Sequence, residues 1–147
     1  MTKSTAYIIF QVAETTYAIS TDVVQQMEMV EQITRAPNSP EYLDGVAYLR
    51  GQVVPVINLR SRFGHPRIEY DMQARLIVIR VGPRTVALAV DRAREYLSIP
   101  EEKILPPPAM MMDENENFVR GVIALNERLL MILDVEKVLA YPEKAHA

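Results

Sequence analysis

The strongest constraint on the fold of this chain is an internal repeat. Residues 7–19 hold two short apolar runs separated by a polar turn, and the same pattern returns in residues 76–88, at an offset of 69. Residues 45–58 repeat as residues 121–134, at an offset of 76. Two repeats in the same order indicate an internal duplication. Because the offset grows by seven, we expect about seven extra residues in the second half, between residues 106 and 118.

The strands predicted in each half are short and apolar. Turn residues separate them into a hairpin, a third strand, a loop and a closing hairpin, a pattern typical of small barrels or sandwiches. Five strands leave exposed edges unless the sheet curls. We therefore expect an all-β chain with a single domain over residues 1–147, built from half-barrels at about 7–63 and 74–140. One or two helical turns should follow each barrel, at Leu59–Phe63 and Val135–Leu139.

Composition excludes several classes of protein. With 147 residues, of which 49% are hydrophobic, the chain can bury a core without help from a metal or a disulfide. It has no cysteine, which rules out disulfides, thiolate zinc sites and cysteine nucleophiles. A net charge of −3 disfavours binding to nucleic acid, and no apolar run approaches the ~18–20 residues of a membrane span. We expect a cytoplasmic protein with no signal peptide, cofactor, metal site, membrane insertion or nucleic-acid partner.

Side chains suited to catalysis are scarce. The two histidines are His65, in a Gly-His-Pro turn, and His146, the penultimate residue. Neither a glycine-rich phosphate loop nor metal-ligand spacing occurs. Asn58 and Asp134 occupy matching places in the repeat, which indicates a role at the end of a strand. An enzyme that uses Asp134 or His65 remains an alternative to a protein-binding adaptor, and a small nucleic-acid-binding barrel is a third class.

Each of three segments has two interpretations, one as part of the folded structure and one as a surface that binds a partner protein. Arg50-Gly51 is either a solvated hairpin turn or an exposed guanidinium that binds a partner's carboxylate or backbone carbonyls. Pro106-Pro107-Pro108, followed by Met110-Met111-Met112, is either a rigid loop or a protein-docking edge. Residues 23–33 have more apolar surface than one face of a short strand needs, which favours core packing or an exposed interface strand.

Several motifs follow one another in a fixed order along most of the chain. The stretch from Tyr42 to Arg60 reads YLDGVAYLRGQVVPVINLR, with APNSP before it and Val90-Asp91 after it. The segments GVIAL and LMILD close the second half. Together, from about Tyr7 to Leu139, these motifs closely resemble those of the CheW family of chemotaxis coupling proteins.

The resemblance implies two five-stranded, SH3-like β-barrels related by a pseudo-twofold axis. It also implies a non-enzymatic adaptor that couples chemoreceptors to a CheA-type histidine kinase. Its partners would be the regulatory domain of the kinase and the cytoplasmic tip of the receptors, and it would be monomeric when free. The alternative within this class is a coupler of a non-flagellar pathway that controls twitching, development or a second messenger.

The resemblance further implies roles for individual positions. Arg50 matches the family's receptor-contacting arginine. The positions that match kinase-binding sites in the first barrel are Val24, Gln26, Ile33 and Gly45. In the second barrel, Leu105 and Met110 match the contact that forms rings with the next kinase regulatory domain. Gln26 stands where some members carry Glu, and Glu28 stands where some carry Arg.

Overall fold

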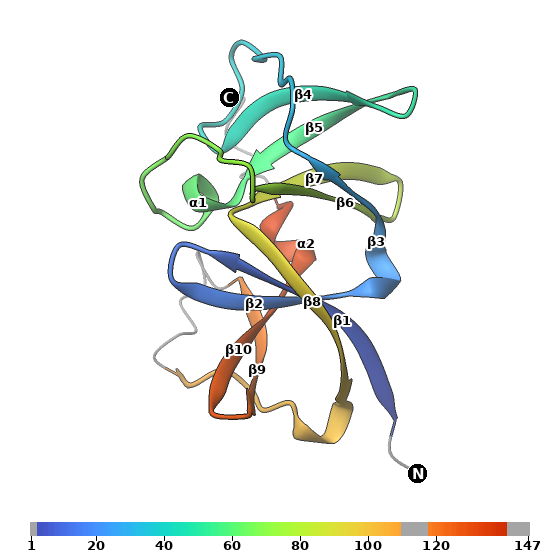
Figure 1. Cartoon of the computed structure of the whole chain (residues 1–147), viewed down its shortest axis with the longest axis vertical. Coiled ribbons are helices and arrows are strands. Elements are labelled where there is room, and N and C mark those ends of the chain that lie inside the picture. Colours follow the sequence, from blue (N-terminus) through green and yellow to red (C-terminus); the bar gives the residue numbers. More distant parts are fainter. Residues whose placement is uncertain (1–2, 110–117, 141–147) are drawn as a thin grey trace.

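The computed structural model describes residues 3–109 and 118–140, and in these residues ten strands form two five-stranded sheets (Figure 1). The strands are β1 (Ser4–Val12), β2 (Thr15–Ser20), β3 (Val24–Met29), β4 (Leu43–Leu49), β5 (Gln52–Asn58), β6 (Arg75–Val81), β7 (Arg84–Val90), β8 (Arg92–Pro100), β9 (Val119–Leu125) and β10 (Arg128–Leu133). The same described residues hold four short helical turns: η1 (Thr21–Val23), α1 (Leu59–Arg62), η2 (Glu101–Lys103) and α2 (Val135–Val138). None of the described helices is long and apolar enough to cross a membrane.

Each sheet curls into a small SH3-like barrel. The sheet β3-β6-β7-β5-β4 forms the upper barrel of Figure 1, and the sheet β8-β1-β2-β10-β9 forms the lower barrel. A pair of backbone hydrogen bonds between Thr34 and Val46 joins the segment after β3 to β4, and an equivalent pair between Leu105 and Val122 joins the segment after β8 to β9. These two bridges bring together the open edges of each sheet, as expected for strands that must hide their edges.

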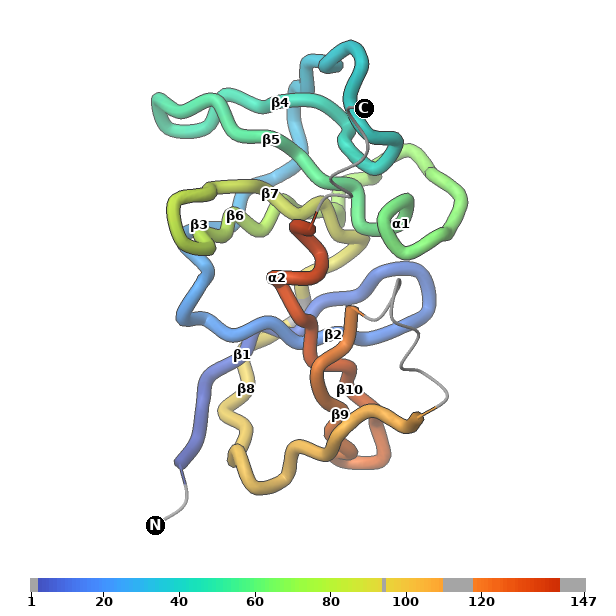
Figure 2. Tube along the Cα trace, turned by 180° about the vertical axis from the view of Figure 1, so that it is seen from behind, coloured from blue at the N-terminus to red at the C-terminus, as the bar shows by residue number. Residues whose placement is uncertain are grey.

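The two barrels do not correspond to the two halves of the sequence. The hairpin β1–β2 of the first half pairs with β8, β9 and β10, and the hairpin β6–β7 of the second half pairs with β3, β4 and β5. The expected half-barrels at 7–63 and 74–140 are therefore wrong as barrel boundaries, because the repeats exchange their first hairpins. The strand β8 continues directly from β7 but lies in the other barrel, as the tube view shows (Figure 2).

The pseudo-twofold relation between the barrels extends to irregular details. The strand order of one barrel becomes that of the other when each strand is replaced by its repeat partner. Register shifts at Leu43/Gly45 in β4 and at Val119/Gly121 in β9 fall at matching places. The parallel pairs also match, since β5 pairs with β7 and β10 pairs with β2. The duplication inferred from the sequence therefore underlies the folded symmetry.

In the part of the chain that the structure describes, the buried apolar residues form three clusters. One fills the lower barrel around Tyr7, Ile9 and Ile132, and its counterpart fills the upper barrel around Leu76 and Val78. The third lies between the barrels and takes buried residues from both: Ile8, Phe10, Val12, Tyr17, Ile19, Ile57, Leu59, Ile77, Ile79, Val81, Val86, Leu88, Val90, Phe118, Leu133, Val138 and Leu139. Strands β1 and β6 are thus apolar on both faces, one toward a barrel interior and one toward the other barrel.

The turns and helices match the repeat as well. Arg50-Gly51 and Asn126-Glu127 each place two successive residues at positive φ, as two-residue hairpin turns require. The side chain of Asn58 accepts a hydrogen bond at the start of α1, and that of Asp134 does so at the start of α2. The end-of-strand role expected for both residues is confirmed, and so are the two helical turns.

Candidate functional site

The residues singled out in the first half gather on the β3 and β4 side of the upper barrel. Val24 and Gln26 lie on β3, Ile33 lies in the segment between β3 and β4, Gly45 lies on β4, and Arg50 forms the β4–β5 turn. This edge is where the barrel closes through the Thr34–Val46 bridge. The structure thus places all five positions on one barrel, although only some of them are exposed.

Gly45 is buried and is required by the backbone rather than available for contact. Its φ is +144°, a region that residues with a side chain rarely adopt. A Cβ atom at this position would lie 2.0 Å from the carbonyl oxygen of Thr34 and 2.9 Å from the Cα of Arg35. Gly45 therefore lets two chain segments pass close together at the bridge, and it can affect a partner only through their placement.

The other three positions divide between two hollows. Val24 and Gln26 line a hollow of about 120 Å³ together with Tyr96 of β8, so this hollow has walls from both barrels. Ile33 lines a separate, open pocket of about 1000 Å³. All three side chains are half-buried, and Ile33 packs against the cluster inside the upper barrel. The structure does not merge them into a single apolar patch.

Arg50 is exposed and already has an intramolecular partner. Its Nε donates a hydrogen bond of 2.9 Å to Oε2 of Glu28 on β3, and 72% of its side chain is accessible to solvent. An exposed ion pair of this kind contributes only about 0–1 kcal/mol to stability. The guanidinium therefore remains free to exchange Glu28 for a carboxylate from a partner at little cost to the fold.

The lower barrel has a corresponding edge. Leu105 forms the bridge to Val122 and is 58% exposed. Gly121, the repeat partner of Gly45, lies beside this bridge with its Cα facing Ile104. Met110, and with it the Met110–Met112 stretch, lies outside the described residues. Each barrel therefore presents a closing edge with exposed or half-buried apolar side chains beside it.

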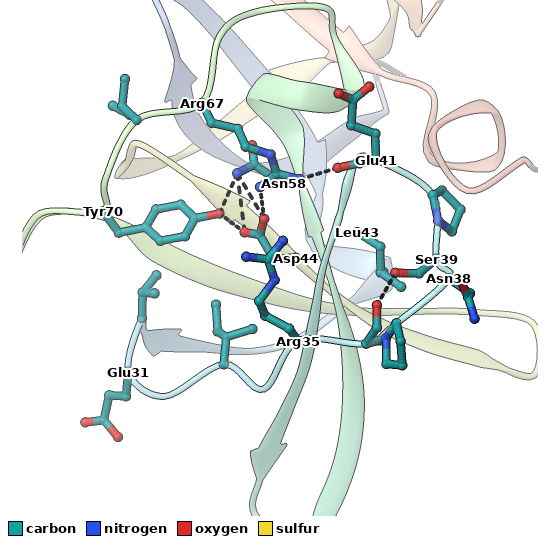
Figure 3. A pocket seen from close by; sticks show the side chains of 16 residues that line it. Glu31, Arg35, Asn38, Ser39, Glu41, Leu43, Asp44, Asn58, Arg67 and Tyr70 are labelled. Atoms are coloured by element: carbon teal, nitrogen blue, oxygen red, sulfur yellow. Dashed lines mark hydrogen bonds and ion pairs between the residues drawn. The ribbon is translucent and has the colours of Figure 1, made fainter.

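A polar cluster that sequence reasoning missed lines the 1000 Å³ pocket (Figure 3). The carboxylate of Asp44 accepts hydrogen bonds from the hydroxyl of Tyr70, from Nη1 of Arg67 and, at 3.3 Å, from Nδ2 of Asn58. Nδ2 of Asn58 also lies 2.9 Å from the hydroxyl oxygen of Tyr70. Asp44 occupies the bulge of β4, and Arg67 and Tyr70 come from the connection between the halves. Asp44 and Asn58 both fall within the Tyr42–Arg60 motif, but no repeat or motif links them to Arg67 and Tyr70 in the sequence.

The cluster is built for structure rather than for proton transfer. Burial, followed by the hydrogen bond to the Asp44 carboxylate, raises the pKa of Tyr70 above its ordinary value, so the phenol stays neutral. Donors from three residues hold the Asp44 carboxylate in place, and neither His65 nor Asp134 lines this pocket. The Asp134 carboxylate instead accepts from the backbone N–H of Lys137. Among the residues that the structure describes, no group of three or more histidine or acidic side chains could hold a metal.

Comparison with known proteins agrees with this architecture. Residues 6–143 match the family described as CheW-like domain. The chain is 35% identical to the chemotaxis protein CheW of Klebsiella aerogenes, over 95% of this chain and 84% of that protein. It is 24% identical to Protein FrzA of Myxococcus xanthus, over 90% of this chain and 84% of that protein.

A solved structure shares the fold. The crystal structure of the scaffolding protein TtCheW from Thermoanaerobacter tengcongensis superposes with a TM-score of 0.86 and 27% sequence identity, covering 95% of this chain and 94% of the other. The match extends through both barrels, which also form a pseudo-symmetric pair in this chain. On the basis of its sequence, its fold and this coverage, the chain belongs to the CheW-like domain family.

Proposed function

We propose that the chain is a non-enzymatic adaptor that couples chemoreceptors to a CheA-type histidine kinase in the cytoplasm. The observation that supports this most is the pair of closing edges, one on each barrel, in a chain that matches the CheW-like family over residues 6–143. The edges lie toward opposite ends of the molecule (Figure 1). In this proposal each edge binds a kinase regulatory domain and the exposed Arg50 turn of the upper barrel binds the receptor, so the chain connects its partners without performing chemistry on them.

The kinase regulatory domain binds the upper barrel in this proposal. Val24, Gln26 and Ile33 supply half-buried side chains on β3 and on the segment that leads from β3 to the bridge, and Gly45 keeps the bridge closed. Contacts of this type favour a modest interface, near the low end of roughly 1,200–2,000 Å². Arg50, at the tip of the same barrel, binds the cytoplasmic tip of the receptor by exchanging Glu28 for an acidic group.

The lower barrel supplies the second contact. Leu105, at its closing edge, is exposed and would meet a further kinase regulatory domain, together with Met110. Because the two edges are related by the duplication, each end can bind a similar surface of a different partner copy. Alternation of adaptor and kinase domains would then build a ring. The free adaptor would be a monomer.

A substitution at Ile33 tests the kinase-binding edge. Ile33→Asp would bury an unpaired carboxylate at the interface, and we expect calorimetry to show a loss of several kcal/mol in binding to the kinase regulatory domain. Met72→Asp adds the same charge at a side chain that is 80% exposed and outside both edges, so it should bind normally. Circular dichroism checks that both variants are folded. Equal affinity of the two variants would reject this edge as the kinase site.

A second candidate is a coupler that serves a pathway other than flagellar chemotaxis. The similarity to FrzA, a relative whose name does not refer to chemotaxis, supports this second candidate. The two candidates share the same fold and edges and differ in the kinase and receptors that they join. Capture of partners from native lysate, followed by identification of the kinase, separates them.

A further inference from the structure

The side chain of Arg62 joins the two barrels at one point. Arg62 ends α1, which follows β5 of the upper barrel, but its guanidinium binds the end of α2, which follows β10 of the lower barrel. Nε donates to the carbonyl of Val138 at 2.8 Å, and Nη2 donates to the carbonyls of Lys137 at 3.1 Å and Ala140 at 3.0 Å. The last carbonyls of a helix lack partners within the helix, so Arg62 caps α2 from the other barrel.

The same guanidinium is flanked by one aromatic ring from each barrel. Its central carbon lies 4.4 Å from the ring centre of Tyr42, which precedes β4, and 4.7 Å from that of Phe118, which precedes β9. Tyr42 and Phe118 are repeat partners at the offset of 76. Because the two distances are nearly equal, the guanidinium lies about midway between equivalent rings of the two barrels. Its own repeat partner is Val138, a buried apolar residue, so the duplication supplies only one such arginine.

A second arginine of α1 makes a parallel connection. Nε of Arg60 binds both carboxylate oxygens of Asp91, at 3.1 and 3.0 Å, in an ion pair whose side chains are only about one-fifth exposed. Asp91 lies at the junction where β7 of the upper barrel continues into β8 of the lower one. The same carboxylate accepts the backbone N–H of Ala13, in the β1–β2 turn of the lower barrel, at 2.7 Å. Both connections thus start from α1 and end on the lower barrel.

We propose that α1 is a two-arginine clamp that fixes the orientation of one barrel relative to the other, with Arg62 as its central positioning residue. The apolar cluster between the barrels resists separation, but apolar packing has little directional preference. A guanidinium held by three carbonyls and two ring faces has a fixed geometry. The clamp therefore sets the angle at which the two closing edges are presented. Its consequence for assembly, though not the clamp itself, rests on the proposed adaptor function.

Paired spin labels test the clamp without any partner protein. The chain has no cysteine, so Val53→Cys on β5 and Leu129→Cys on β10 give one label on each barrel, at side chains that are 67% and 54% exposed. Pulsed electron paramagnetic resonance then reports the distribution of distances between them. Arg62→Met removes the donors and keeps the apolar stem. The control is Arg80→Met, because Nε of Arg80 donates within its own turn, to the carbonyl of Gly82, and the described residues show no bond from it to the other barrel.

We expect a single narrow distance in the parent and in Arg80→Met, a broader or shifted distribution in Arg62→Met, and an intermediate one in Arg62→Lys. An unchanged distribution in a folded Arg62→Met would overturn the proposal. So would complete unfolding of this variant, because each barrel has its own core cluster and should survive the loss of a clamp.

A binding measurement separates the clamp from the adaptor function. Arg62→Met should bind the kinase regulatory domain normally in a two-component assay, but should weaken joint assembly of kinase and receptor by about tenfold, within the range of coupling between two sites. A broadened distance with normal joint assembly would leave the clamp standing and reject its role in assembly. If the parent chain itself failed to bind either partner, the adaptor function alone would be refuted.

Discussion

Replacement of Gly45 by alanine should open the upper barrel at its closing edge. The added Cβ would lie 2.0 Å from the carbonyl oxygen of Thr34, a distance that no rotation of a side chain can relieve because the obstacle is backbone. The segment containing Thr34 must therefore move away. That movement breaks the two hydrogen bonds of 2.8 Å between Thr34 and Val46, which close the barrel.

The magnitude follows from two contributions. Holding a residue with a side chain at φ +144° costs about 1–3 kcal/mol, and the two lost hydrogen bonds contribute about 1 kcal/mol each. We expect Gly45→Ala to lower the free energy of unfolding by about 4 kcal/mol. For a chain of this size, that loss corresponds to a fall in Tm of roughly 10 °C.

Gly121→Ala is the matched control in the other barrel. A Cβ at Gly121 would approach the Cγ2 of Ile104 at 2.6 Å, but this atom ends a side chain that can rotate, so we expect a cost of only about 1–2 kcal/mol. Urea unfolding of both variants gives the comparison, and amide hydrogen exchange at Val46 reports whether the bridge is open. Equal stability loss in the two variants, with Val46 still protected, would refute the reasoning. If instead Gly45→Ala opens the bridge as expected, any loss of partner binding in this variant comes from the changed shape of the edge, because Gly45 has no side chain to contact a partner.

Three further predictions concern single residues. Arg50→Ala should change the free energy of unfolding by less than about 0.5 kcal/mol in urea titrations, yet weaken receptor binding in co-sedimentation by roughly 1.5–3 kcal/mol. Burial, followed by the hydrogen bond to Asp44, raises the pKa of Tyr70. The stability that its neutral phenol contributes is therefore complete at pH values below the ordinary tyrosine pKa of 10.0 and is lost as the pH rises above it. Tyr70→Phe should reduce this loss of stability at alkaline pH, measured in unfolding curves. Asn58→Ala should lower the free energy of unfolding by about 2–3 kcal/mol and Asp134→Ala by about 1 kcal/mol, as measured by thermal unfolding. Both substitutions remove a helix cap, but Asn58 also donates a hydrogen bond to Asp44.

The elements that follow from local sequence were predictable. The two hairpins in each half, the turn at Arg50-Gly51 and the caps at Asn58 and Asp134 follow from apolar runs, turn residues and repeat spacing, and the structure confirms them. In each of these cases, a few neighbouring residues determine the local backbone.

The features that depend on long-range placement were not predictable from the chain. The repeat shows that two hairpins are equivalent, but not which sheet each one joins, and so the exchange of β1–β2 and β6–β7 was missed. The Asp44 cluster was missed because Tyr70 lies in a connection with no apolar periodicity. Arg62 gave no signal because its partners are backbone carbonyls and ring faces, which leave no charge pattern in the sequence.

Reconstitution with receptor-containing vesicles tests the central claim most directly. Purified CheA-type kinase is mixed with vesicles that carry a chemoreceptor, with or without this chain, and the vesicles are sedimented. If the chain is the adaptor, the kinase sediments with the receptor vesicles only when the chain is present, and the Ile33→Asp variant sediments without the kinase. Kinase recovery that is the same with and without the chain, together with absence of the chain from the vesicles, would contradict the account.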